Sequence, residues 1–211
     1  MTPDLHLQTG LAQLPLVAIL RGLTPPEAPA IGQALVQAGF GLLEVPLNSP
    51  QPLDSIAALV AQHPGQLIGA GTVMSAADVR NVQAAGGRLI ISPHFDVDVV
   101  REALRLGLAC MPGVATPSEA FAALRAGAHA LKLFPAEMIG PAVVKALRAV
   151  LPPGVPLLPV GGIAPGNMAA YRQAGATGFG IGSALYAPGQ SAGQTAQAAL
   201  AFITAWRATA A

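Results

Sequence analysis

The sequence is poor in cysteine, in charge and in long apolar runs, and each shortage excludes a class of protein. Its 211 residues include one cysteine, Cys110, so no internal disulfide can form. Charged residues make up 10% of the chain and the formal net charge is +1, which leaves no basic field to hold DNA or RNA. No stretch is long and apolar enough to cross a membrane, and residues 1–10 lack the basic and apolar segments of an export signal. We therefore expect a cytoplasmic enzyme or binding protein with neither nucleic acid nor membrane as a partner.

Apolar residues, by contrast, make up 53% of the chain and suffice for a sizeable core. They recur in short runs rich in β-branched residues, which predict strands at 17–20, 42–45, 67–70, 89–91, 108–111, 130–133, 157–160 and 178–181. Segments with helical spacing predict helices at 25–38, 52–62, 76–85, 97–106, 117–126, 141–150, 165–173 and 194–208. No shift in composition marks a linker, so we expect residues 1–211 to form a single domain.

The alternation of strands and helices predicts the fold class. Runs that are apolar throughout suit parallel strands covered on both faces, and parallel neighbours need a helical crossover between them. Glycines such as Gly39 and Gly127 follow the expected last helical turns, where a left-handed residue ends a helix. The repeated β-α unit favours an α/β fold closed into a (β/α)8 TIM barrel. The alternative is an open doubly wound sheet, but residues 21–24 lack its glycine-rich nucleotide turn.

Lys132 is the most informative residue at the expected carboxyl ends of the strands, where such barrels carry their reactive groups. It is one of two lysines in the chain and interrupts the apolar run 130–134. Desolvation lowers the pKa of an ammonium group, which is how a lysine becomes a nucleophile able to form a Schiff base with a ketone. The alternatives are a lysine that extends to the surface or pairs with a structural carboxylate. Lys145, on an expected helix, is of that exposed kind.

Glu44 raises the same question, because residues 42–47 would form a continuous core strand without it. Burial beside a neutral amine raises the pKa of a carboxyl group toward the range useful for proton transfer, whereas burial beside an ammonium lowers it. The alternative is a salt bridge to Lys132 or Arg21 without any chemistry. Either interpretation places the side chains of Glu44 and Lys132 in the same interior.

Two glycine-containing turns close the last two expected strands, Gly161 with Gly162 and Gly182 with Ser183. Many barrels bind a phosphate group at this position through backbone N–H groups. Glycine permits a close approach of phosphate oxygens that a side chain would block. The alternative is a pair of ordinary strand-to-helix turns.

Other polar residues near strand ends carry weaker signals. Arg21 can hold a carboxylate through its planar guanidinium group or form a structural ion pair. Thr72 offers a hydroxyl group beside the same interior, although threonine is also a common helix N-cap. No His, Asp or Cys lies at metal-binding spacing from His94 or His129, so we expect no metal site. Cys110, with its apolar neighbours, is interpreted as a core residue.

Several segments together resemble the KDPG and KHG aldolase family, class I aldolases with a (β/α)8 barrel. These segments are 43–50 (LEVPLNSP), 69–73 (GAGTV), 131–135 (LKLFP), 161–163 (GGI) and 180–183 (GIGS). The resemblance covers nearly the whole chain. Each motif alone is modest, but the Lys-Leu-Phe-Pro segment combined with a glutamate at an earlier strand end is specific.

The resemblance implies that Lys132 forms the Schiff base and that Glu44 relays protons through a water molecule. It also implies a homotrimer and a reaction that needs no metal or other cofactor. The pyruvyl group would be lined by Thr72, Pro93 and Phe134, and the phosphate group would be held by Gly161, Gly162, Gly182 and Ser183.

Asn48 departs from the family pattern, because many KDPG aldolases carry an arginine there that holds the substrate carboxylate. Arg21, at a neighbouring strand end, can replace the missing charge, and we expect both Arg21 and Asn48 to contact the substrate. Arg21 and Gly22 together with residues 46–50 resemble the branch that cleaves 2-dehydro-3-deoxy-6-phosphogalactonate, and we expect that phosphorylated keto acid as substrate. The gluconate analogue, which differs in configuration at C4, is the alternative.

Two other functions are weighed against an aldolase. A phosphosugar epimerase or isomerase that uses Glu44 to abstract a proton explains the phosphate turns but not Lys132. A non-catalytic binder of phosphorylated ligands has no use for an amine desolvated in an apolar strand. Both are therefore less consistent with the sequence than an aldolase.

Overall fold

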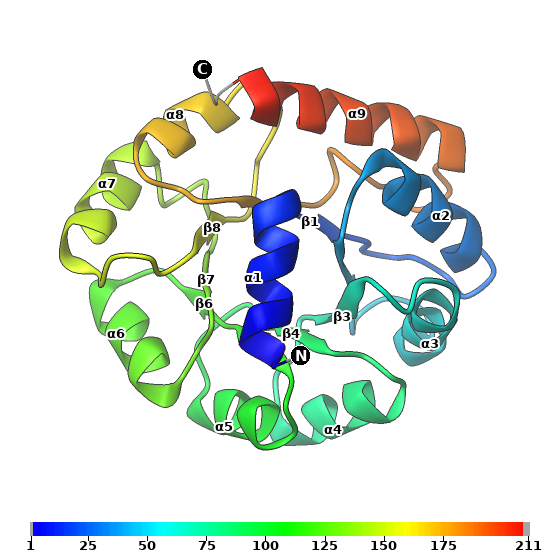
Figure 1. The fold of residues 1–211 in the computed structure, drawn as a ribbon, viewed down its shortest axis with the longest axis horizontal. Coiled ribbons are helices and arrows are strands. Elements are labelled where there is room, and N and C mark those ends of the chain that lie inside the picture. The colour runs from blue at the N-terminus through cyan, green and yellow to red at the C-terminus, as the bar shows by residue number, and fades with distance from the viewer. Residues whose placement is uncertain (1, 209–211) are drawn as a thin grey trace.

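The computed structural model describes residues 2–208, along which strands and helices alternate (Figure 1). The strands are β1 (Leu16–Ile19), β2 (Leu42–Pro46), β3 (Leu67–Gly71), β4 (Leu89–Ile91), β5 (Ala109–Met111), β6 (Gly113–Val114), β7 (Leu131–Leu133), β8 (Leu157–Pro159) and β9 (Phe179–Ile181). The helices are α1 (Pro3–Gln13), α2 (Ala28–Ala38), α3 (Pro52–Gln62), α4 (Ala76–Ala84), α5 (Val97–Arg105), α6 (Pro117–Ala126), α7 (Pro141–Val150), α8 (Met168–Gln173) and α9 (Ala192–Ala208). Within residues 2–208, no helix is both long and apolar enough to span a membrane.

The strand pairings in this part of the chain are parallel, which confirms the expected type of sheet. Six strands pair in the order β5-β4-β3-β2-β1-β9, and three pair in the order β6-β7-β8. Pro112 alone separates β5 from β6, and its carbonyl accepts a 3.0 Å hydrogen bond from the Lys132 N–H. At the other junction a parallel bridge pairs Val160 with Gly180. The strands therefore curl around a common interior, and helices surround them as a ring (Figure 1).

The strands and helices expected from the sequence are present, but two helices begin later than expected. Pro29 has no N–H to donate and its ring would meet the carbonyl four residues earlier, so residues 25–27 form a turn before α2 begins at Ala28. Asn167 delays α8 in another way. Its Oδ1 accepts a hydrogen bond from the Ala164 N–H at 3.0 Å and its Nδ2 donates to the Gly162 carbonyl at 2.8 Å, which stabilises a turn at 165–167.

Helix α1 and the short strand β6 are not among the elements expected from the sequence. The Thr2 hydroxyl group caps α1 by accepting a hydrogen bond from the Leu5 N–H at 3.3 Å. The helix lies across one end of the curled strands (Figure 1). Its Leu7 is buried, and Leu11 packs against the same apolar cluster. Helix α1 therefore closes one end of the interior.

The apolar side chains form two clusters, because successive residues of a strand point to opposite faces. The larger cluster lies between strands and helices and includes Leu43 and Val45 of β2. The smaller cluster is enclosed by the strands and contains Leu7, Val17, Leu42, Leu67, Leu89, Ile91, Ala109, Met111, Ala130 and Leu158. Glu44 follows Leu42 by two residues, and Lys132 follows Ala130 by two. The alternation therefore turns both ionisable side chains toward the enclosed interior.

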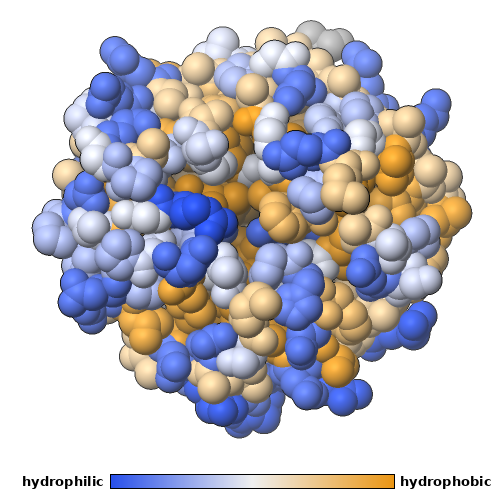
Figure 2. Space-filling view, turned by 180° about the vertical axis from the view of Figure 1, so that it is seen from behind, coloured by the Kyte–Doolittle hydropathy of each residue, from blue (hydrophilic) through white to orange (hydrophobic). Residues whose placement is uncertain are grey.

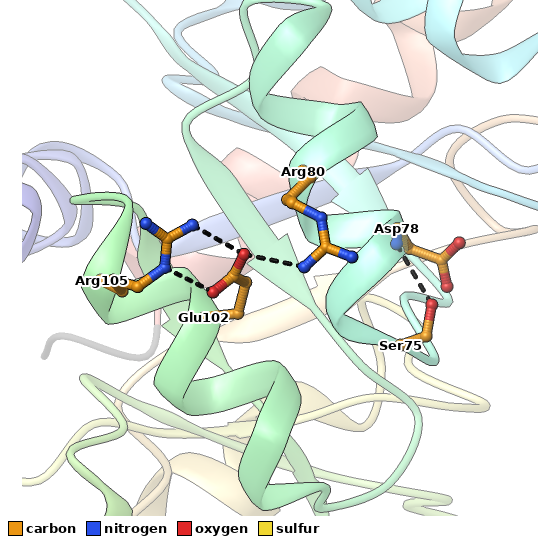
Figure 3. Close-up of polar contacts among 5 residues, drawn as sticks. All are labelled: Ser75, Asp78, Arg80, Glu102 and Arg105. Carbon is orange, nitrogen blue, oxygen red and sulfur yellow. Dashed lines mark hydrogen bonds and ion pairs between the residues drawn. The ribbon is translucent and has the colours of Figure 1, made fainter.

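Ion pairs join two of the surrounding helices on the surface (Figure 3). Glu102 of α5 accepts hydrogen bonds from the Nε and Nη2 atoms of Arg105 at 2.7 and 2.8 Å, and from Nη1 of Arg80 in α4 at 3.0 Å. Ser75 caps α4 by accepting a 3.1 Å hydrogen bond from the Asp78 N–H. Hydrogen bonds from Arg105, and to a lesser extent from Arg80, lower the pKa of Glu102 to about 2. Since both ion pairs lie at the surface, their contribution to stability is small.

We expect Leu7→Ala to destabilise the protein by about 2–5 kcal/mol, because the substitution leaves a cavity where α1 meets the enclosed cluster. Leu7 is 1% exposed, whereas Leu5 of the same helix is 51% exposed. Leu5→Ala is thus the matched control, with an expected change within about 0.5 kcal/mol. Urea denaturation of both variants measures the difference. Equal stabilities would show that α1 does not contribute to the core.

Candidate active site

The candidate site lies at the carboxyl ends of the strands, opposite the end closed by α1. Figure 2 shows this face, where apolar surface gathers around the hollowed centre and hydrophilic groups reach in from the rim. A cavity of about 270 Å³ opens here. Its lining includes the strand-end residues Arg21, Phe134, Gly161, Gly162, Gly182 and Ser183. Six of the residues singled out from sequence therefore lie around one cavity.

Glu44 and Lys132 are both buried, with exposed fractions of 1% and 5%, and neither is among the residues that line this cavity. The Nζ atom of Lys132 lies 4.7 Å from the centroid of the Phe134 ring. Glu44 Oε2 is buried and has no hydrogen-bond partner in residues 2–208. Within these same residues no ion pair of 4 Å or less joins Glu44 to Lys132 or Arg21. The alternative of a simple structural salt bridge is therefore wrong, and both groups face the interior as expected.

Burial shifts the pKa values of these two groups toward each other. It raises the pKa of Glu44 to about 7, although the positive charges of Lys132 and Arg21 oppose the shift. It also lowers the pKa of Lys132; the negative charge of Glu44 opposes that change and the positive charge of Arg21 adds to it. Such a carboxyl group can take up and release a proton near neutral pH. A lysine with a lowered pKa is neutral, and therefore nucleophilic, in a larger fraction of molecules.

Gly71 provides the space that the Glu44 carboxyl group occupies. A Cβ atom at Gly71 would overlap the carboxyl group of Glu44, so any other residue there would displace it. The next residue, Thr72, has a φ angle of 57°, in the left-handed region that β-branched residues rarely adopt. Backbone strain of this kind concentrates at functional sites. The sequence alone indicated neither the space that Gly71 leaves for Glu44 nor the strained backbone at Thr72.

Arg21 and Asn48 come together although 27 residues separate them. Both are exposed, and Nη1 of Arg21 donates a 2.8 Å hydrogen bond to Asn48 Oδ1. Arg21 also lines the cavity that contains the glycine turns. This places a guanidinium group beside the expected phosphate site.

The glycine turn after β8 has its own structural requirement. Gly161 and Gly162 have φ angles of 112° and 60°, which favour glycine. A Cβ atom at Gly161 would overlap the Glu137 carboxyl group. Gly182, by contrast, has an ordinary φ angle and would meet nothing within 4 Å. The first turn therefore needs glycine whether or not a phosphate group binds there.

Four other residues discussed from the sequence are not among those that line this cavity: Pro93, His94, Cys110 and His129. Pro93 and His94 line a second cavity of about 220 Å³, and Phe134 lines both cavities. His129 accepts a 3.0 Å hydrogen bond at Nδ1 from the Cys110 N–H. Burial raises the pKa of the Cys110 thiol to about 12, as expected for a core residue and not for a nucleophile. No group of three or more His, Cys, Asp or Glu in residues 2–208 is placed to hold a metal ion.

Comparison with protein families gives the same assignment as the sequence motifs. Residues 7–198 match the family described as KDPG and KHG aldolase. The chain belongs to this family. It is 49% identical over 195 residues to the probable 2-dehydro-3-deoxy-6-phosphogalactonate aldolase of Rhizobium meliloti (strain 1021), covering 92% of each chain. It is 48% identical over 196 residues to the 2-dehydro-3-deoxy-6-phosphogalactonate aldolase of Escherichia coli (strain K12), covering 92% of this chain and 96% of that one.

Solved structures with this fold agree with that assignment. The native KDPGal structure matches with a TM-score of 0.92 and 48% identity over 94% of this chain and 97% of that chain. A cube-shaped cage designed by fusing symmetric oligomeric domains matches with the same TM-score and identity over 94% and 74%. A KDPG aldolase from Legionella pneumophila, with pyruvate captured as a covalent carbinolamine, matches with a TM-score of 0.80 and 27% identity over 96% and 98%. The gluconate-series enzyme is thus the more distant of these.

We expect Glu44→Gln to change how stability depends on pH. The folded-state pKa of Glu44, about 7, lies above its ordinary value of 4.5, so the folded protein retains a proton that the unfolded chain has released. The contribution of Glu44 to stability is therefore lost progressively as the pH rises between these two pKa values, and it changes little further above the folded-state value. The variant lacks this titration, so it is expected to gain about 3 kcal/mol relative to wild type across that range, measured by urea denaturation.

Glu102→Gln is the control for this measurement. The pKa of Glu102 is about 2, so this carboxyl group is already ionised in both states over the upper part of the range. The stability difference between Glu102→Gln and wild type is expected to be flat between about pH 5.5 and 8. A flat difference for Glu44→Gln as well would show that Glu44 stays ionised in the folded protein.

Proposed function

We propose that this protein is a class I aldolase that cleaves 2-dehydro-3-deoxy-6-phosphogalactonate to pyruvate and glyceraldehyde 3-phosphate. The observation that carries the proposal is the buried pair Lys132 and Glu44, whose pKa values shift toward each other. Nζ of Lys132 lies 4.7 Å from the ring centroid of Phe134, which lines the same cavity as Arg21. The names of the relatives at 48% and 49% identity support the galactonate series.

The proposed architecture is one closed (β/α)8 barrel formed by a single domain, residues 1–211. Closure is supported by the Val160–Gly180 bridge at one junction of the two sheets and by the hydrogen bond from Lys132 to Pro112 at the other. We further propose a cytoplasmic homotrimer. The cage built from symmetric oligomeric domains, one of which resembles this chain, supports association but not a particular number of subunits.

In the proposed reaction neutral Lys132 attacks the C2 ketone of the substrate. Protonation of the carbinolamine hydroxyl group lets it leave as water, and the resulting iminium group withdraws electrons from the C3–C4 bond. Burial of Lys132 favours this step, because it increases the fraction of uncharged amine. The electron pair of the breaking C3–C4 bond then moves into the enamine.

Glu44 is the proposed proton carrier. It accepts the proton of the C4 hydroxyl group, directly or through a water molecule, as glyceraldehyde 3-phosphate leaves. It then returns a proton to C3 of the enamine, which restores the iminium group. Hydrolysis releases pyruvate, neutral Lys132 and the proton that was taken up during dehydration. A pKa of about 7 suits both directions of transfer, and the unpartnered Oε2 atom is available to a substrate or water.

The other residues are proposed to bind the substrate. The pyruvyl group would contact Thr72, Pro93 and Phe134, of which Pro93 and Phe134 line a cavity. The phosphate group would contact the turns that contain Gly161, Gly162, Gly182 and Ser183, all of which line the cavity of Arg21. Arg21 would contact an anionic group of the substrate from the cavity wall, with Asn48 beside it. The substrate itself is the phosphorylated keto acid, and no cofactor enters the proposed reaction.

The gluconate-series substrate is the nearest alternative, since the two compounds differ only in configuration at C4. A ratio of kcat/KM values for the two epimers, measured by coupling pyruvate release to lactate dehydrogenase, decides between them. The epimerase and binding-protein alternatives release no pyruvate in the same assay.

We expect reduction with borohydride in the presence of pyruvate to attach one pyruvyl group, and peptide mapping to place it on Lys132. Reduction converts an imine to a stable amine at the lysine that formed it. Lys132→Ala is expected to abolish both the adduct and turnover, whereas Glu44→Gln still forms the adduct but turns over slowly.

The exposed Lys145 supplies the control for this experiment. Lys145→Ala is expected to keep both the adduct and wild-type activity. An adduct on Lys145, or normal activity in Lys132→Ala, would exclude the Schiff-base mechanism at Lys132.

A further inference from the structure

Two side chains tie the loop after β1 to the loop after β2. Asn48 Oδ1 accepts the 2.8 Å hydrogen bond from Nη1 of Arg21. Ser49 Oγ accepts a 2.9 Å hydrogen bond from the backbone N–H of Gly22, the residue after Arg21. Ser49 is 8% exposed, so its hydroxyl group satisfies a backbone donor in a site with little water. Consecutive residues of one loop therefore hold consecutive residues of the other.

Gly22 also contacts the loop that follows β9. Its φ angle of 81° lies in the left-handed region, and a Cβ atom there would approach Pro188 Cγ to 2.6 Å. Pro188 belongs to the segment that begins with Gly182 and Ser183 in the cavity wall. The backbone that carries Arg21 is thus fixed from two sides.

The chemistry of Asn48 leaves the charge of Arg21 intact. An amide oxygen is neutral and accepts from one of the five N–H donors of the guanidinium group. Within residues 2–208, the side chain of Arg21 makes one hydrogen bond, to Asn48. In the same residues no carboxylate oxygen lies within 4 Å of the guanidinium nitrogens of Arg21. Its remaining donors are therefore available to an anion in the cavity.

We propose that Asn48 and Ser49 are positioning residues that hold Arg21 toward an anionic group of the substrate. This inference rests on the proposed function and assigns to Asn48 an indirect role, through Arg21, in place of a direct contact with substrate. An arginine held in place before binding loses less conformational freedom when the anion arrives. The two residues therefore act mainly on substrate affinity.

A double-mutant cycle tests this assignment. The proteins are wild type, Arg21→Met, Asn48→Leu and the double variant, and KM and kcat for the phosphorylated keto acid are measured separately. Asn48→Leu is expected to raise KM about fivefold, the worth of one hydrogen bond, and Arg21→Met to raise it further, since it removes a charged contact. In the Arg21→Met background, Asn48→Leu is expected to have no further effect on KM.

In the same cycle, Ser49→Ala is expected to raise KM in the wild-type background and to have no further effect on KM in the Arg21→Met background. Equal factors in both backgrounds would show that Asn48 or Ser49 contacts the substrate itself or acts on the fold, and would overturn the proposal. An unchanged KM in Arg21→Met would overturn it too, because no anion would then depend on Arg21. Thermal unfolding of each variant identifies any general loss of structure.

Asn48→Asp is a matched variant of the same size. It keeps the acceptor for Arg21 but adds a negative charge that neutralises the guanidinium group, so it is expected to raise KM more than Asn48→Leu. An equal or smaller rise would contradict the argument from charge.

Trapping of pyruvate on Lys132 by borohydride, at saturating pyruvate, is expected in every variant. If the variants form the adduct but Asn48→Leu changes KM by the same factor in both backgrounds, the positioning role alone is disproved. Absence of the adduct in wild type would instead disprove the proposed function.

Discussion

The central constraint in this structure is that two groups of opposite charge share an interior otherwise lined by apolar side chains. Transfer of either charge from water into such surroundings is costly, and the chain does not offset the cost with a direct ion pair between Glu44 and Lys132. The groups instead shift their pKa values toward neutrality. Because burial disfavours the charged form of both groups, the stability cost and the chemical reactivity of this pair have the same physical origin.

Several features of the fold follow from that constraint. Parallel strands alternate their side chains between the enclosed cluster and the helices, which aims both groups inward. Gly71 leaves room for a carboxyl group where any side chain would displace it. Helix α1 covers one end of the interior with Leu7, so the opposite end alone carries the turns that line the cavity. The cavity therefore lies at the carboxyl ends of the strands, on the side away from α1.

The sequence predicted the features that leave a local signal. Continuous apolar runs marked the strands, and a charge within such a run marked Glu44 and Lys132 as exceptional. Helix α1 has a weaker signal, because Leu5 is exposed while Leu7 is buried, and Thr9 and Gly10 are poor helix formers. The hydrogen bond between Arg21 and Asn48, and the fit of Glu44 against Gly71, depend on how separate strands align, and no local pattern encodes that alignment.

The glycine turns show why a motif needs its surroundings before it indicates a ligand. Gly161 already requires glycine because of its φ angle and the adjacent Glu137 carboxyl group, so glycine there does not by itself indicate a phosphate group. The presence of Arg21 in the same cavity is the stronger argument for an anion. Arg21 also lowers the pKa values of both Glu44 and Lys132. In the proposed reaction, an anion bound at Arg21 would cancel part of this positive potential and so favour the protonated form of Glu44.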